Sequence, residues 1–205
     1  MIRLARTHPD WALGFEDETR WSRLARPALH SWAEAAVPLR LVEQAVAKED
    51  PDPKALACYG LLVRWARPAG GWHEGAWLRF VDGRPVSAVT TQFLAWSCEQ
   101  LAAAGKTALL LVWDNASWHK SAAVRQWLRA HNRRVRAAGA GVRIAPCLLP
   151  SKSPWLNPIE PKWVHGKRRV VAPDGLLTAH ELAARVCEAF GCPYEPHLTI
   201  PEQAA

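Results

Sequence analysis

The sequence has 205 residues, of which 49% are hydrophobic and 22% charged, so it fits one globular domain and excludes a disordered chain. The 26 Lys and Arg against 19 Asp and Glu give a formal net charge of +7, which suits a nucleic acid partner without identifying one. No apolar stretch approaches the roughly 18 residues of a membrane span, and the N-terminus lacks a signal-peptide core, so the expected location is the cytoplasm.

The first predicted strand carries an acidic segment. Alternate residues from Trp11 to Phe15 are apolar, which is the pattern of a half-buried strand. Asp17 has the same parity and is expected on the same face, whereas Glu16 and Glu18 point to the other face. A carboxylate on an apolar face is costly unless a partner such as a bound cation compensates it. The alternative is a surface Asp at the end of a strand.

Further strands are expected in the first half of the chain. An extended segment covers about residues 54–64. Residues 77–81 and 86–89 flank Asp82 and Gly83, a dipeptide that favours the turn of a β-hairpin.

The clearest strand covers residues 108–113. It follows a helix that is expected to begin at Thr90 or Thr91 and to end at Gly105. Every position of the strand is apolar, as in a central strand covered on both faces. Asp114 ends it, and sites in open α/β sheets form at such strand ends. The alternative for Asp114 is a turn residue that bonds its own backbone.

A basic amphipathic helix is expected next, with Ser121 as its cap. Its apolar stripe comprises residues 124, 127, 128, 131 and 135. Arginines occupy another face, where they would either follow a DNA backbone or simply be solvated. A strand over residues 142–149 follows the helix.

A proline-rich loop over residues 150–158 then leads to a helix that carries Glu160. Asn157 and Glu160 have the spacing of a capping box, with Pro158 in the first turn, which would explain Glu160 without any chemistry. A carboxylate that binds a metal cannot fully serve as such a cap.

The last helix is expected to start at a capping box formed by Thr178 and Glu181 and to end at Gly191. Strands therefore come early and then alternate with helices. This order predicts an α/β domain in which helices pack on a mixed sheet.

Two longer segments give the acidic residues a shared context. Residues 111–119 read Leu-Val-Trp-Asp-Asn-Ala-Ser-Trp-His, and residues 149–163 read Leu-Pro-Ser-Lys-Ser-Pro-Trp-Leu-Asn-Pro-Ile-Glu-Pro-Lys-Trp. Together they resemble the signature of the DDE transposases of the insertion-sequence 630 group, relatives of the Tc/mariner elements. The segment Phe-Glu-Asp-Glu at residues 15–18 resembles the first acidic motif of that group. The resemblance extends over about residues 11–191.

The resemblance implies a single catalytic domain over residues 1–205 with a ribonuclease H-like fold of the retroviral-integrase type, a mixed sheet flanked by helices. It implies that Asp17, Asp114 and Glu160 are the catalytic, metal-binding triad. The expected cofactor is Mg²⁺, with Mn²⁺ as a substitute and two ions in the site, because paired ions can activate water and stabilise the leaving oxygen. The implied function is DNA cleavage at the ends of a transposable element, followed by strand transfer into target DNA.

Other residues are expected to support this chemistry. Asn115 and His119 are candidates for orienting a phosphate or a water, although a His after such a strand is more often structural, and Asn157 belongs to the third motif. The expected contacts to DNA come from the basic helix and from the helix that carries Glu160: Arg125, Arg129, Arg133, Arg136, Lys162, Lys167, Arg168 and Arg169.

Two features depart from the family pattern. The first catalytic strand begins near Trp11, which leaves no room for the usual N-terminal helix-turn-helix domain, so a separate DNA-binding protein is an expected partner. The 45 residues between Asp114 and Glu160 are more than usual. The expected protein acts as a dimer on double-stranded DNA in the bacterial nucleoid. The alternatives are an inactive or truncated remnant that only binds DNA, and a hydrolytic nuclease without strand transfer.

Overall fold

The computed structural model describes residues 1–23, 46–151, 153–170 and 176–201. Within them, no helix combines the length and the apolar character needed to cross a membrane. The elements are, in chain order, α1 (Ile2–Thr7), β1 (Trp11–Ser22), β2 (Ala55–Ala66), β3 (Trp72–Val81), α2 (Ser87–Ala103), β4 (Ala108–Trp113), α3 (Ala122–Ala138), β5 (Arg143–Leu148), the short 3-10 helix η1 (Pro154–Leu156), α4 (Ile159–Arg169) and α5 (Ala179–Phe190).

The five strands form one mixed sheet in the order β3-β2-β1-β4-β5. β2 is antiparallel to both β1 and β3, whereas β4 is parallel to both β1 and β5. β1 is therefore the middle strand, and β4 beside it is buried at every position, as its continuous apolar run predicts. The predicted mixed sheet flanked by helices is confirmed.

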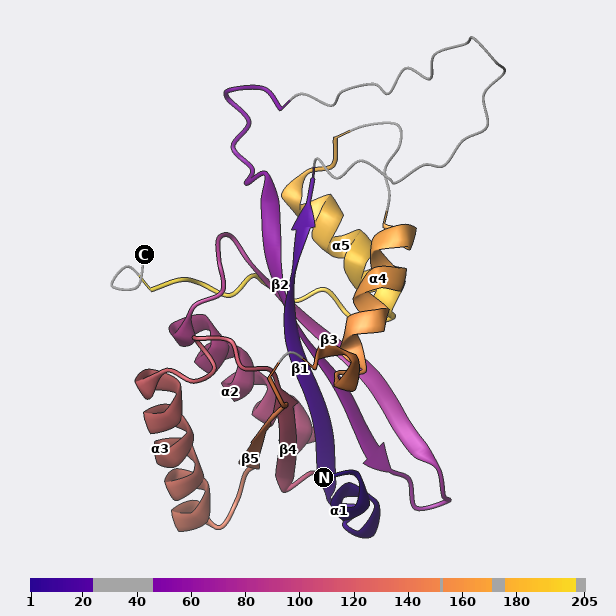
Figure 1. Cartoon of the computed structure of the whole chain (residues 1–205), viewed down its shortest axis with the longest axis vertical. Coiled ribbons are helices and arrows are strands. Elements are labelled where there is room, and N and C mark those ends of the chain that lie inside the picture. Colours follow the sequence, from indigo (N-terminus) through magenta and orange to yellow (C-terminus); the bar gives the residue numbers. More distant parts are fainter. Residues whose placement is uncertain (24–45, 152, 171–175, 202–205) are drawn as a thin grey trace.

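Each face of the sheet has its own hydrophobic core because successive side chains of β1 point in opposite directions. Leu13 and Phe15 pack in the core that contains Trp163 of α4 and residues of α5. Ala12 belongs to the other core, together with Phe93 of α2 and residues of α3. In Figure 1, α4 and α5 accordingly lie on one side of the sheet, and α2 and α3 on the other.

The hairpin predicted around Asp82 and Gly83 is wrong, because β3 pairs with β2 instead. The turn that joins β2 to β3 contains Gly70 and Gly71, whose φ angles of 89° and 78° suit glycine. The backbone N–H of Arg67 closes this turn by donating to the carbonyl of Gly71 at 3.1 Å.

Residues 86–89, predicted as a strand, instead begin α2. Val86 is the N-cap residue, and its N–H donates to the Tyr59 hydroxyl of β2 at 3.2 Å. The Thr90 hydroxyl donates to the Val86 carbonyl at 3.2 Å, so this threonine lies inside the helix and is not its cap. The helix start is fixed by a contact with a distant strand, which the local pattern does not contain.

The two later helix starts are confirmed. Ser121 caps α3 by accepting the N–H of Val124 at 3.2 Å, and Thr178 forms a reciprocal capping box with Glu181 at the start of α5. The strand predicted at residues 142–149 is observed as β5, and the one at residues 54–64 as β2. The loop at 150–158 includes position 152, which lies outside the described residues.

Candidate functional site

Asp17 lies in β1 on the face that α4 covers, and only 8% of the residue is exposed. The indole Nε1–H of Trp163 donates to Asp17 Oδ2 at 2.9 Å. Gly60 in β2 is paired with Asp17, and a Cβ atom at Gly60 would lie 2.4 Å from Trp163 Cη2. The missing side chain at residue 60 therefore makes the space through which the indole reaches the carboxylate.

Asp114 follows β4, at the end of the strand that neighbours β1. Its Oδ1 accepts the backbone N–H of Ala116 at 2.8 Å and lies 2.8 Å from Nδ1 of His119. The hydrogen bond from His119 lowers the pKa of Asp114, although partial burial opposes this. Asp114 thus makes the backbone bond expected of a turn residue with one oxygen, and its side chain is 52% exposed.

Glu160 lies in the first turn of α4, but the capping box considered for it is not formed. The N-cap residue is Pro158, which provides no side-chain hydrogen bond. Asn157 is buried, and its Nδ2 donates to the backbone carbonyl of Glu16 at 3.0 Å. Among the described residues, the Glu160 carboxylate takes no hydrogen bond or ion pair, so no helix cap competes for it.

These acidic side chains lie close enough for their charges to interact. Burial, with the charge of Glu160 adding to it and the Trp163 hydrogen bond opposing it, raises the pKa of Asp17 to about 7. Burial also raises the pKa of Glu160, with the charge of Asp114 adding to the effect. Asp114 and Glu160 line a pocket of about 310 Å³ together with Asn115 and Asn157.

The donor set suits a hard divalent cation. Three carboxylates from three elements offer oxygen ligands, which Mg²⁺ and Mn²⁺ prefer. Burial is the main cause of the raised pKa of Asp17 and of Glu160, and a neighbouring carboxylate adds to it in each case, so positive charge at this place would offset both shifts. A bound cation would supply that charge, so Asp17, Asp114 and Glu160 fit the metal that their residue types suggest.

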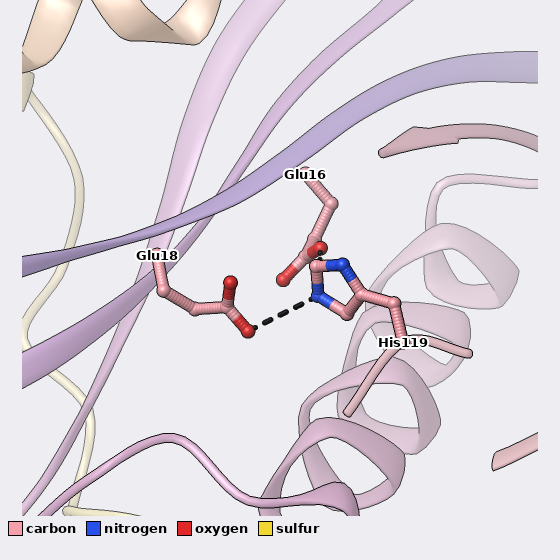
Figure 2. A group of neighbouring side chains, drawn as sticks. All are labelled: Glu16, Glu18 and His119. Carbon is pink, nitrogen blue, oxygen red and sulfur yellow. Dashed lines mark hydrogen bonds and ion pairs between the residues drawn. The ribbon is translucent and has the colours of Figure 1, made fainter. Parts of the chain in front are cut away.

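A second acidic group lies on the other face of β1. Glu16 is fully buried, and its Oε2 is 3.1 Å from Nε2 of His119. Glu18 Oε1 is 3.2 Å from the same nitrogen and accepts the indole N–H of Trp118 at 2.8 Å. Figure 2 shows both carboxylates converging on the imidazole. The predicted parity of residues 16–18 is thus observed, but the sequence did not indicate this group as a site.

The imidazole of His119 is held between acids on both sides. Its burial disfavours the charged form, but the neighbouring Glu16, Asp114 and Glu18 outweigh burial and raise the pKa of His119 to about 12. The ring also stacks on Trp113 with centroids 4.6 Å apart. His119 therefore lies behind Asp114, and it contacts the triad through that residue alone.

The remaining supporting residues link elements to one another. Asn115 Nδ2 donates to the carbonyl of Leu149 at 2.5 Å, which joins the ends of β4 and β5. Asn157 joins α4 to β1, as described above. Both asparagines also line the pocket of Asp114 and Glu160.

The structure does not bring all the basic residues together. The four arginines of α3 predicted to contact DNA are exposed, but α3 covers the face of the sheet opposite to α4. On α4, Lys167, Arg168 and Arg169 are exposed. Lys162 instead forms an ion pair with Glu74, with Nζ 2.6 Å from Oε1. Only the α4 group lies on the same helix as Glu160.

Comparisons with known proteins agree with this architecture. A family model described as DDE superfamily endonuclease matches residues 73–181. The Mos1 transposase paired-end complex with left transposon end is similar with a TM-score of 0.57 and 16% identity, over 90% of this chain and 48% of that chain. The Mos1 strand transfer complex is similar with a TM-score of 0.54 and 15% identity, over 90% and 48%. No curated protein matches the sequence.

The chain therefore spans about half the length of the solved structures that it matches. At this level of identity the likeness concerns the fold. Together with the strand order, it confirms the predicted ribonuclease H-like fold class.

Proposed function

The chain belongs to the DDE superfamily endonuclease family, and from this premise we propose that it is the catalytic core of a transposase of the insertion-sequence 630 group. One observation carries the proposal: Asp17, Asp114 and Glu160 come from β1, the end of β4 and the first turn of α4, and their charges act on one another. The reaction would be DNA cleavage at the ends of an element and transfer of the freed end into target DNA. Residues 1–205 would form a single catalytic domain.

In this proposal Asp17, Asp114 and Glu160 hold Mg²⁺, or Mn²⁺ in its place, with two ions in the site. Such ions, when bound, activate the attacking oxygen and stabilise the leaving oxygen of a phosphodiester. The protein groups mainly position the reactants and balance charge, as is usual in phosphoryl transfer.

The chain itself contributes rigidity to two of the three carboxylates. Trp163 fixes one oxygen of Asp17, and His119 with the N–H of Ala116 fixes one oxygen of Asp114. The second oxygen of Asp114, Oδ2, accepts no hydrogen bond among the described residues. Preorganised groups of this kind lose little free energy to reorientation when the substrate binds.

The proposed substrate is double-stranded DNA. The titles of the Mos1 structures name a transposon end and a strand transfer complex for that protein. Here the exposed basic residues of α4 would hold the backbone at the site, and the arginines of α3 would contact a more distant stretch. We propose a separate helix-turn-helix protein as a partner in recognising the ends, and a dimer that pairs the two ends, in the bacterial cytoplasm.

Nicking of supercoiled plasmid tests the proposed chemistry. We expect Mg²⁺- or Mn²⁺-dependent nicking by the wild type and a loss of roughly 10²–10³-fold in Glu160→Gln, which removes a charge that the transition state needs. Glu188→Gln makes the same change at an exposed position of α5 and should leave the activity unchanged. Equal nicking by the wild type and Glu160→Gln would contradict the assignment of the triad.

A strand-transfer assay with a labelled DNA end separates the remaining alternatives. Joined product from the wild type supports a transposase core. Cleavage without joining would indicate a hydrolytic nuclease, whereas metal-independent DNA binding without cleavage would indicate a remnant.

A further inference from the structure

Glu16 has no hydrogen bond that balances its burial. The residue is fully buried, and neither carboxylate oxygen has a hydrogen-bond partner among the described residues. The contact with His119 is close, at 3.1 Å between Oε2 and Nε2, but it lacks the alignment of a hydrogen bond. A buried carboxylate in this condition is costly unless a further group satisfies it.

His119 is arranged as a metal-binding histidine. Its Nδ1 lies 2.8 Å from Asp114 Oδ1, and its Nε2 faces Glu16 and Glu18. Without a metal both nitrogens carry hydrogen, and a metal bound at Nε2 would replace the proton there while Nδ1–H keeps its bond to Asp114. Histidine ligands of metals usually donate their other ring N–H to a carboxylate in this manner, which fixes the tautomer and the orientation of the ring. The stacking of the ring on Trp113 restricts it further.

Glu18 supplies a third donor that is itself held in place. Its Oε1 accepts the indole N–H of Trp118 at 2.8 Å and lies 3.2 Å from Nε2 of His119. Glu18 and Trp118 also line a pocket of about 570 Å³, so the Glu18 side of the group adjoins this pocket.

We propose that Glu16, Glu18 and His119 form a divalent metal site on the face of β1 opposite to Asp17, with Zn²⁺ as the expected occupant (Figure 2). One ligand atom from each residue lies within 4.8 Å of the others. Ligands about 2.0–2.2 Å from one ion lie roughly 3.0–3.6 Å apart, so the observed separations of 3.1 and 3.2 Å need little adjustment.

The donor set favours a different ion from that of the triad. An imidazole with two carboxylates suits Zn²⁺ or Mn²⁺, whereas Mg²⁺ prefers oxygen ligands alone. Charge supports a divalent ion as well: Glu16, Glu18 and Asp114 surround the single imidazole, and one imidazolium cannot neutralise three carboxylates. Water from the Glu18 side would complete the coordination.

Metal binding to the full chain tests this site apart from the triad. The Asp17→Asn/Glu160→Gln double variant disables the triad but keeps Asp114, which orients His119. After removal of metals with a chelator, the wild type, this double variant and Glu16→Gln are dialysed against Zn²⁺, and bound zinc is counted by elemental analysis. Titration with Co²⁺ then reports the coordination through visible absorption, with Mg²⁺ as the competing hard ion.

We expect one tightly bound Zn²⁺ per chain in the double variant, not displaced by excess Mg²⁺. Glu16→Gln should weaken it by at least about 10–100-fold. Glu18→Gln, at a half-buried position, should also weaken binding and serves if Glu16→Gln does not fold. No zinc in the folded double variant, or equal binding by Glu16→Gln and the wild type, would overturn the site. Because plasmid cleavage is not measured, these outcomes are independent of the proposed function.

Discussion

Glu16 and Asp17 are neighbours in β1, both are buried acids, and they lie on opposite faces of the same sheet. Asp17 receives a hydrogen bond from an aromatic residue of α4 and repulsion from Glu160. Among the described residues, Glu16 receives a close, poorly aligned contact from His119 and repulsion from Glu18. The comparison shows that strand alternation alone can place two neighbouring acids in separate environments, one beside a second carboxylate and the other beside a histidine that three carboxylates surround.

The largest expected effect separates the two acids by activity. Asp17→Asn should reduce metal-dependent plasmid nicking by roughly 10²–10³-fold, because it removes a charged ligand of the proposed triad. Glu16→Gln should reduce it by about tenfold at most, since Glu16 reaches Asp114 only through His119. Nicking rates at saturating Mn²⁺ measure both. Equal losses in the two variants would mean that the two faces form one functional unit.

The two acids should also give metal-free protein a stability that falls with rising pH. Burial raises the pKa of Asp17 to about 7 and that of Glu16 to about 8, above their values in the unfolded chain. The folded chain therefore binds more protons, so this stabilisation is complete below about pH 4 and is lost as the pH rises through those values.

Urea unfolding in chelator at several pH values measures this slope. Asp17→Asn should stabilise the protein relative to the wild type mainly at high pH. The difference in the free energy of unfolding between variant and wild type should be roughly 2–4 kcal/mol larger at high pH than at low pH. Glu16→Gln should act in the same direction. A wild-type stability that increases between about pH 4 and pH 8 would contradict the buried, repelled state of both acids.

A smaller effect is expected from Trp163, which we regard as a positioning residue. Trp163→Phe keeps most of the packing against Trp21 and Phe190 but removes the hydrogen bond to Asp17. We expect nicking to fall by about 10–100-fold and the Mn²⁺ concentration for half-maximal activity to rise. If Trp163 had a purely structural role, Trp163→Phe would lower the stability without changing that Mn²⁺ concentration. Such a result would mean that Trp163 is not a positioning residue.

The smallest effect concerns the space that Trp163 occupies. Gly60→Ala places a methyl group where the indole lies, and we expect a loss of about 1–3 kcal/mol in the free energy of unfolding from overpacking. Gly75→Ala on β3 is the matched control, since a Cβ there meets only ordinary contacts at 3.6 and 3.9 Å. Equal losses in the two variants would indicate a general cost of alanine in these strands.

The sequence predicts those parts of the fold that depend on local pattern. The continuous apolar run of β4, the Ser121 cap and the parity of Glu16 against Asp17 are all visible in the chain and are observed. The segment 86–89 was wrongly predicted as a strand, because the Tyr59 hydroxyl that fixes the start of α2 belongs to another strand.

The candidate site shows the same division. The sequence indicates Asp17, Asp114 and Glu160, because their residue types and the motifs that flank them are local features of the chain. The partner of Asp17 is not local, because Trp163 lies 146 residues later, and two of the three acids that surround His119 come from β1, about a hundred residues earlier. Whether Asn157 caps a helix also depended on a distant carbonyl, that of Glu16. The group formed by Glu16, Glu18 and His119 was therefore missed. One signal could have indicated it: Glu16 and Glu18 share a strand face, and their strand was expected beside the one that leads to Asp114 and His119.

The hydrogen bond between Asn157 and the backbone of Glu16 has a consequence for the unusual length of chain between Asp114 and Glu160. This bond and the hydrogen bond from Trp163 to Asp17 attach α4 to β1. The position of the helix is therefore set by its contacts with that strand. The connecting chain can therefore lengthen or shorten at the exposed turn after α3 without changing the position of Glu160 relative to β1. In such a fold the number of residues between two motifs gives the length of the connecting segment. It does not determine the position of the second motif on the sheet.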